Sequence, residues 1–237
     1  MINLKKALRQ GLSDLGLLLE DVQISQLLDY LGLIQKWTKV YNLTALRDPE
    51  EMLTHHLFDS LAVIEPLRRQ IEGAQIALSE SHHVELGLEP TPEQAQSERL
   101  VKLLDVGSGA GLPGIVIAIC CPSISVDCVD AVAKKAAFVQ QVALTLKLPK
   151  LRGLHARVEN LTDKYNLITS RAFASLADFT SWSSAALAER GVWLAMKGKY
   201  PADEIAALPG NVAVFHVEQL TVPGLKAARC IVWMRKI

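Results

Sequence analysis

The chain has 237 residues, of which half are apolar, 21% are charged and 5% are aromatic. This composition is too apolar for a disordered chain and is sufficient for one globular domain with an additional segment. The 25 basic and 25 acidic residues cancel, so the net charge by itself indicates no partner. The longest apolar run, residues 115–121, is too short to cross a bilayer, and no targeting segment is recognisable. We therefore expect a cytoplasmic protein without a membrane partner.

The charges are distributed unevenly along the chain. Residues 1–100 contain 9 basic and 15 acidic side chains, whereas residues 101–237 contain 16 and 10. One interpretation is that the second half faces an anionic partner while the first half holds or covers it. The other is an ordinary difference in solvated surface charge, and the sequence leaves both open.

The first 72 residues predict helices. Apolar residues recur at helical spacing from Ile24 to Trp37. A second helix is expected to begin after Asp48, which would act as the N-cap before Pro49, and to extend to Ile64. We predict an N-terminal helical region over residues 1–72, with a polar joint at residues 41–44.

Residues 73–99 break this pattern. They contain five glutamates, two prolines and the pair His82-His83. We interpret the segment as an acidic surface insertion or linker. Neither histidine has a cysteine or acidic partner at a ligand spacing, so we expect no metal site.

A glycine-rich loop follows the first apolar strand of the second half, residues 101–106. Asp105 lies at the end of that strand, Gly107, Gly109 and Gly111 alternate after it, and Pro113 begins a helix. In a doubly wound sheet, this turn is where nucleotides bind. Asp130 ends the second strand, where a carboxylate can accept hydrogen bonds from a ribose diol.

From residue 100 onward, short strands alternate with helices, which predicts an α/β fold with a mainly parallel sheet. The last two strands have no helix between them and predict an antiparallel hairpin, as in the seven-stranded, Rossmann-like sheet of class I methyltransferases. The further strands are expected at residues 124–129, 151–155, 165–169, 192–196, 212–217 and 230–234, and the helices from 113, at 134–148 and at 176–188.

Two ligands fit the glycine loop. Gly109, Gly111 and Gly114 match a dinucleotide pattern, which would imply NAD(P). A pyrophosphate, however, requires that pattern directly at the strand-to-helix turn, and here the glycines begin earlier, directly after Asp105. An acid at that place suits the positively charged amino-acid end of S-adenosylmethionine. This favours a methyl donor, with an NAD(P)-dependent oxidoreductase as the alternative.

Residues 104–114 resemble the first motif of the RsmG family, also called GidB, which are 16S ribosomal RNA guanine-N7 methyltransferases. The resemblance is most family-specific at Ser170–Ser175 and covers nearly all of the chain except Gly73–Arg99. It implies a methyltransferase domain over residues 100–237 that transfers a methyl group from S-adenosylmethionine to N7 of a guanine in 16S rRNA. Its substrate would be the small ribosomal subunit or a precursor, and we expect a monomer. Further matching segments are Trp37–Thr44, Glu51–Leu53, Ala156–Glu159 and Met196–Gly198.

The resemblance also implies site residues. Arg171 ends the fourth strand and would lie beside the donor methyl, as a positioning or electrostatic residue. Independently of the resemblance, the basic residues Lys197, Lys199 and Arg229 are expected to meet RNA phosphates. The predicted donor-binding residues are Asp105, Gly107, Ser108, Gly109, Gly111, Leu112, Asp130, Ala131, Val132, Val158, Glu159 and Arg171.

The expected chemistry needs few catalytic groups. Guanine N7 carries a free lone pair, so positioning is sufficient and we expect neither a general base nor a covalent nucleophile. The four cysteines are expected to be reduced core residues. His56 and Asp59 are expected to form a buried pair, to join the two parts of the molecule or to touch RNA. Alternative functions are methylation of another RNA or a small molecule, and RNA binding without catalysis, which the intact loop and Asp130 disfavour.

Overall fold

Seven strands form one sheet in a computed structural model, which describes residues 2–73 and 101–237. Their order is β3-β2-β1-β4-β5-β7-β6, with five parallel strands and an antiparallel C-terminal hairpin, as predicted. Apart from Gly73, the predicted acidic insertion lies outside the described residues. The strands are β1 (Lys102–Val106), β2 (Ser125–Asp130), β3 (Leu151–His155), β4 (Tyr165–Arg171), β5 (Leu187–Lys197), β6 (Val212–Leu220) and β7 (Arg229–Lys236).

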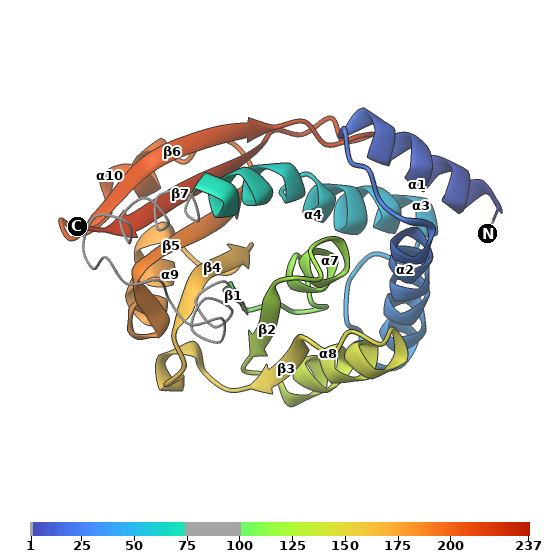
Figure 1. Cartoon of the computed structure of the whole chain (residues 1–237), viewed down its shortest axis with the longest axis horizontal. Helices are drawn as coiled ribbons and strands as arrows, with labels where there is room; N and C mark the ends of the chain where they lie inside the picture. Colours follow the sequence, from blue (N-terminus) through green and yellow to red (C-terminus); the bar gives the residue numbers. More distant parts are fainter. Residues whose placement is uncertain (1, 74–100) are drawn as a thin grey trace, which may run out of the picture.

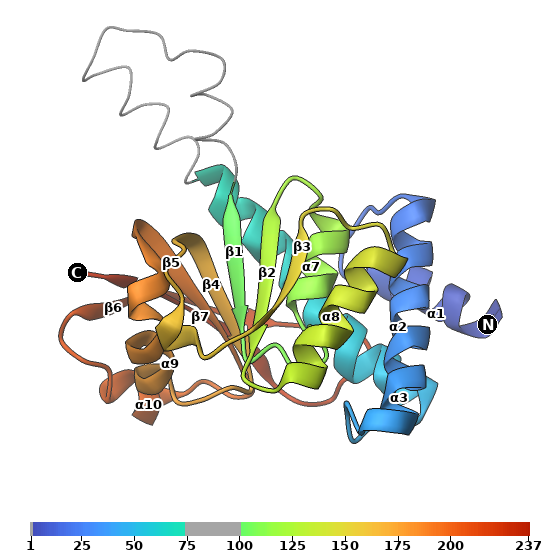
Figure 2. The same cartoon turned by 90° about the horizontal axis from the view of Figure 1, so that it is seen from below.

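Helices cover both faces of the sheet (Figure 2). One face packs against α7 (Gly114–Cys120) and α8 (Ala133–Thr145), together with the N-terminal helices. The other packs against α9 (Leu176–Ser183), and α10 (Ala202–Ala206) lies on the same side. Since the parallel strands run in one direction, their carboxyl ends and the loops after them share one edge, where α/β proteins bind ligands.

The N-terminal region is helical, as predicted. It comprises α1 (Ile2–Asp14), α2 (Asp21–Tyr41), α3 (Pro49–Met52), the wider π-helical segment η1 (Leu53–Phe58) and α4 (Asp59–Leu61), and a further helix follows at residues 64–73. The Asp48 carboxylate accepts from the N–H groups of Glu50 and Glu51 at 2.9 and 3.0 Å, which confirms the predicted cap. Asn42 caps the C-terminal end of α2, and its φ of 51° places it in the left-handed region.

These helices share a hydrophobic core with the sheet region, and Figure 1 shows α2 and α4 lying alongside α7. The ring of Trp37 packs edge-on against Phe138 of α8, with ring centres 5.3 Å apart. Two glutamine side chains extend from α2 to carbonyls of the sheet domain: Gln23 donates to Ile119 and Gln26 to Leu146, both at 2.8 Å. The position of the helical region is therefore fixed by apolar packing and by polar contacts together. The domain boundaries at residues 72 and 99 stay predictions.

The prediction of a helix over residues 176–188 is wrong at its C-terminal end. The helix α9 stops at Ser183, a short 3₁₀ turn follows (η3, Ser184–Ala186), and β5 begins at Leu187 rather than at 192. The Ser183 hydroxyl donates to the Phe179 carbonyl at 2.5 Å and accepts from the Trp193 indole at 2.9 Å. This hydrogen bond to Trp193 of the following strand fixes where the helix ends. The two residues are ten positions apart, so helical periodicity in the sequence does not indicate the contact.

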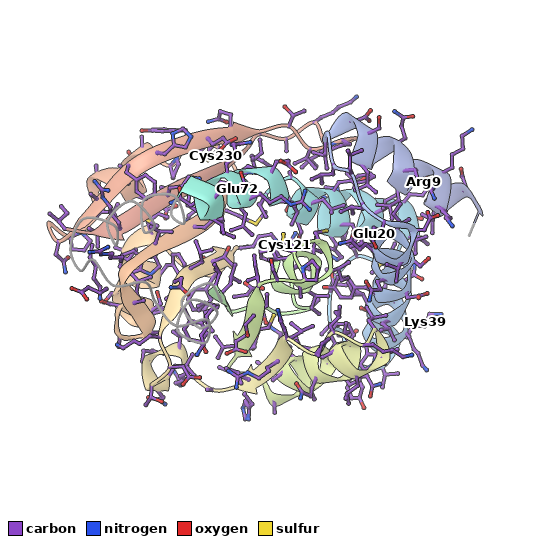
Figure 3. The ribbon with its side chains drawn as sticks, in the orientation of Figure 1. Arg9, Glu20, Lys39, Glu72, Cys121 and Cys230 are labelled. Atoms are coloured by element: carbon purple, nitrogen blue, oxygen red, sulfur yellow. The ribbon has the colours of Figure 1, made fainter. Side chains whose placement is uncertain are left out.

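All four cysteines are free and buried, as predicted. Figure 3 shows Cys121 and Cys230 inside the molecule, whereas Arg9 and Lys39 extend outward from their helices. Burial raises the pKa of the Cys120 and Cys121 thiols, which keeps them protonated and unreactive. No helix in residues 2–73 or 101–237 is long and apolar enough to cross a membrane.

A pair of glycine substitutions tests this packing. A Cβ at Gly153 of β3 would lie 2.3 Å from the Ala136 carbonyl oxygen of α8, whereas a Cβ at Gly32 of α2 meets nothing within 4 Å. We expect Gly153→Ala to lower the unfolding free energy by about 1–3 kcal/mol and Gly32→Ala to raise it by about 0.5–1 kcal/mol. Urea unfolding of both variants measures this, and equal stability of the two would contradict the described approach of α8 to β3.

Candidate donor-binding site

The glycine loop after β1 is built on left-handed backbone positions. Gly107, Gly109 and Gly111 have φ values of 64°, 59° and 84°, which other residues rarely adopt. At Gly107 a side chain is also excluded by space, because its Cβ would lie 2.2 Å from the Phe173 ring. The sequence pattern predicted this loop, but it did not indicate that the Phe173 ring packs against Gly107.

Asp105 supports the loop from beneath. Its carboxylate has no exposed surface, and Oδ2 accepts from the Gly114 N–H at 2.8 Å. The other oxygen, Oδ1, is buried without a hydrogen-bond partner within the described part of the chain. Burial raises the pKa of Asp105 to about 7, against the opposing effect of the Gly114 hydrogen bond. Contact of Asp105 with the amino-acid end of a donor stays a prediction.

Asp130 joins the glycine loop to the loop after β2. Its Oδ2 accepts from the Gly109 N–H at 3.0 Å and its Oδ1 from the Val132 N–H at 2.9 Å. The Lys135 ammonium lies 3.5 Å from Oδ2. A carboxylate oxygen accepts more than one hydrogen bond, so both oxygens retain capacity for ribose hydroxyls.

The predicted donor-binding residues meet at the carboxyl edge of the sheet and divide into two groups by exposure. The accessible group consists of the partly exposed residues Gly107, Gly109 and Arg171 and the exposed residues Ala131, Val132 and Glu159. The buried group consists of Asp105, Ser108, Gly111, Leu112, Asp130 and Val158.

Two contacts at this edge were not indicated by the sequence. The Tyr30 hydroxyl, fully buried in α2, donates to the Ala110 carbonyl of the glycine loop at 2.6 Å. His155 Nε2 lies 3.2 Å from the Ala131 carbonyl oxygen. Tyr30 belongs to the helical stripe from Ile24 to Trp37, but periodicity cannot show which loop its hydroxyl reaches.

Arg171 ends β4, beside the glycine loop in the sheet. Ser170 pairs with Val106, so the residues that follow each strand are neighbours. The Arg171 guanidinium nitrogen Nη1 donates to Asp59 Oδ2 at 2.9 Å and to the His55 carbonyl at 3.0 Å. Asp59 therefore joins the helical region to the sheet, one of the roles expected for it. His56 is also buried, but its ring nitrogen lies 3.0 Å from the Thr44 hydroxyl.

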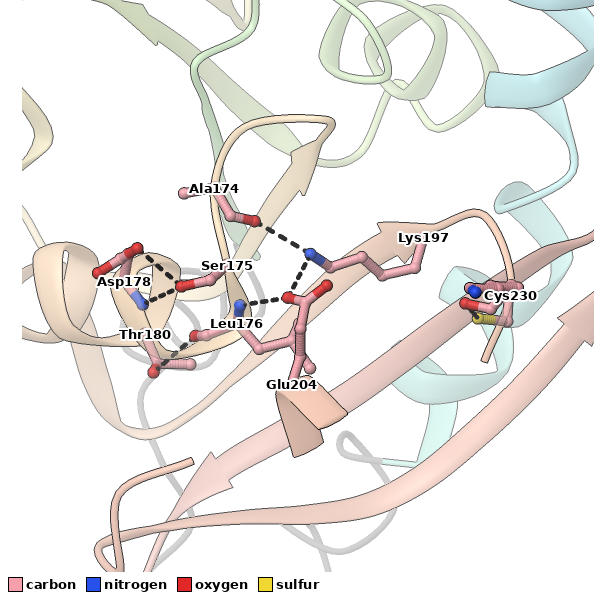
Figure 4. A network of polar contacts seen from close by, with 9 residues as sticks. Ala174, Ser175, Leu176, Asp178, Thr180, Lys197, Glu204 and Cys230 are labelled. Atoms are coloured by element: carbon pink, nitrogen blue, oxygen red, sulfur yellow. Dashed lines mark hydrogen bonds and ion pairs between the residues drawn. The ribbon is translucent and has the colours of Figure 1, made fainter. Parts of the chain in front are cut away.

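Of the three residues predicted to meet RNA phosphates, two have partners within the protein. Lys197 Nζ donates to Glu204 at 2.7 Å and to the Ala174 carbonyl at 3.0 Å, and Glu204 also accepts from the Leu176 N–H (Figure 4). This network fixes the loop that follows Arg171. Arg229 donates to Asp59 at 2.7 Å, and Lys199 is exposed. Their contact with RNA stays a prediction.

Comparison with known proteins assigns this chain to a family. The model of the GidB family, described as rRNA small subunit methyltransferase G, matches residues 23–76 and 80–232. The chain belongs to the GidB family. A curated relative named ribosomal RNA small subunit methyltransferase G, from Albidiferax ferrireducens, is 66% identical over 100% of this chain and 99% of its own. A second relative of that name, from Acidovorax ebreus, is 59% identical over 99% and 96%.

Among solved structures, TrmN from Thermus thermophilus matches 65% of this chain and 51% of its own, with 20% identity and a TM-score of 0.47.

Membership in the GidB family confirms the resemblance that the sequence motifs indicated. It also agrees with the preference for a methyl donor over a dinucleotide at the glycine loop.

Asp130 provides a direct test of the donor site in this GidB protein. Asp130→Ala removes acceptors for the Gly109 and Val132 N–H groups as well as for a ribose. Loss of a hydrogen bond to a charged group costs about 1.5–3 kcal/mol, so we expect S-adenosylmethionine affinity to fall about ten- to a hundredfold. Isothermal titration measures it, with Asp163→Ala as a control because that carboxylate is exposed and far from the loop in sequence. Unchanged affinity in Asp130→Ala would remove this residue from the site.

Asp105 predicts a pH dependence of stability. Because its pKa is raised from 3.8 to about 7 in the folded protein, the folded state retains a proton that the unfolded chain loses above pH 4. This contribution to stability is complete below about pH 4 and is lost as pH rises to about 7. We therefore expect Asp105→Asn to gain stability relative to the parent protein between pH 4 and 8, as measured by urea unfolding. A difference that does not change with pH would show that Asp105 is ionised throughout.

Proposed function

We propose that this chain transfers a methyl group from S-adenosylmethionine to N7 of a guanine in 16S rRNA, acting on the small ribosomal subunit or a precursor in the cytoplasm. The observation that carries the proposal is the match of the GidB family model to residues 23–76 and 80–232, which includes the glycine loop and Arg171. The full-length relatives carry the name of a small-subunit rRNA methyltransferase.

The residues at the carboxyl edge fit the methyl donor. Asp130 has acceptor capacity for the ribose hydroxyls, and the exposed side chain of Val132 next to it offers an apolar surface for the adenine. Gly107 and Gly109 let the backbone approach the methionine part closely. We assign Val158 and Glu159, on the short turn η2 (Val158–Asn160), to the other edge of the adenine.

The bound donor supplies a methyl group on a positively charged sulfur. The lone pair of guanine N7 forms the new bond to carbon while the sulfur–methyl bond breaks, so the sulfur becomes a neutral thioether and the base takes up the positive charge. No proton leaves N7, which is why no general base is required. The protein acts by holding N7 in line with the sulfur–methyl bond. We assign to Arg171 the positioning of an oxygen acceptor on the donor or on the target nucleotide.

A labelling experiment tests this function. Small subunits that lack the modification are incubated with the protein and methyl-labelled S-adenosylmethionine, and the modified nucleotide is mapped. We expect about one methyl group per subunit, at N7 of a single guanine of 16S rRNA, and a much slower reaction with Asp130→Ala. A label in another RNA or in a small molecule would contradict the proposed substrate. Binding of NAD without binding of S-adenosylmethionine would contradict the reaction itself.

A further inference from the structure

One buried carboxylate in the N-terminal helical region holds two arginines of the sheet. Asp59, at the start of α4, is 4% exposed. Its Oδ2 accepts from Arg171 Nη1 at 2.9 Å and its Oδ1 from Arg229 Nε at 2.7 Å. Arg171 ends β4 and Arg229 begins β7, so Asp59 joins two strands that come from distant parts of the chain.

The wide helical turn before Asp59 provides a second acceptor. The Asp59 N–H donates to the carbonyls of Thr54 and His56, not to the carbonyl of His55 as it would in a regular α-helix. The His55 carbonyl instead accepts from Arg171 Nη1 at 3.0 Å. Since one nitrogen of Arg171 is held by two acceptors from the same turn, the direction of the guanidinium is fixed. Such widened turns occur frequently at functional sites.

The cluster keeps an excess of positive charge. Two guanidinium groups face one carboxylate, and His56 in the same turn adds no further charge. Burial, together with the charge of Arg171, lowers the pKa of His56 to about 4, so this histidine is neutral at pH 7. Among the described residues, Nε and Nη2 of Arg171 have no hydrogen-bond partner, and its side chain is 18% exposed. Arg171 therefore retains donors for a ligand at the edge next to the glycine loop.

We propose that Asp59 is a positioning residue for methyl transfer, which holds Arg171 in its working direction beside the glycine loop. The inference rests on the proposed function, in which Arg171 contacts the donor or the target nucleotide. Without the carboxylate, Arg171 and Arg229 would repel each other, and Nη1 of Arg171 would retain only the His55 carbonyl. The free N–H groups of Arg171 would then lose their fixed direction.

A double-mutant cycle tests this role. The parent protein, Asp59→Asn, Arg171→Ala and the double variant are compared in kcat and KM on unmodified small subunits and in S-adenosylmethionine affinity. If Asp59 acts through Arg171, Asp59→Asn lowers kcat/KM or donor affinity about tenfold, the size expected for a charged hydrogen bond. The same change in the Arg171→Ala background then has no further effect. Losses that multiply in the double variant, or full activity of Asp59→Asn, would overturn the proposal.

A matched control separates positioning from general stability. Asp127 of β2 is also buried, at 3% exposed, and pairs with Arg152 while accepting from the Tyr165 hydroxyl at 2.7 Å. Asp127→Asn should lower the melting temperature as Asp59→Asn does, yet leave methyl transfer unchanged at temperatures where the protein is folded. If both variants lose activity in proportion to stability, Asp59 has only a structural role.

If Asp59→Asn does not fold, the mobility of the Arg171 guanidinium in the parent protein provides the test. Side-chain ¹⁵N NMR, with the Arg171 signal assigned from Arg171→Lys, should show slow rotation of its guanidinium before any ligand is added. Free rotation would overturn the proposal. Failure of the proposed function is distinguishable, because the parent protein itself would then not methylate small subunits.

Discussion

Two buried carboxylates determine the shape of the glycine loop, and the remainder of the site depends on that shape. Asp105 accepts from the Gly114 N–H at the far end of the loop, and Asp130 accepts from the Gly109 N–H in its middle. Burying a carboxylate is costly unless it is hydrogen-bonded, which explains why both acids bind backbone N–H groups. The loop can follow this path only because three of its positions are glycines with positive φ.

The N-terminal helices contact the glycine loop and the strand end that form the candidate site. Tyr30 of α2 donates to the Ala110 carbonyl of the loop, and Asp59 of α4 holds Arg171 at the neighbouring strand. This arrangement gives one meaning to the uneven charge along the chain, since an acid of the first half partly neutralises two arginines of the second. Arg69 and Glu218 form a further ion pair between the halves, but here the base belongs to the first half and the acid to the second. Ion pairs between the halves therefore explain only part of the uneven charge.

Local patterns predicted what local physics determines. The alternation of strands and helices, the cap at Asp48, the left-handed glycines and the terminal hairpin all follow from neighbouring residues, and the structure has each of them. Two kinds of feature were missed. The end of α9 depends on a hydrogen bond between Ser183 and Trp193. The orientation of the Arg171 side chain depends on Asp59, an acid distant in sequence. A single sequence does not show such pairings, because many partners of the right chemistry are available for each side chain.

Amide hydrogen exchange with and without S-adenosylhomocysteine, the product form of the donor, tests most directly whether the two carboxylates and the glycine loop form the donor site. The site described above predicts slower exchange on binding at residues 107–111 and 130–132, with a smaller change at Arg171, and no change for NAD. Protection confined to another surface, or equal protection by NAD, would contradict it.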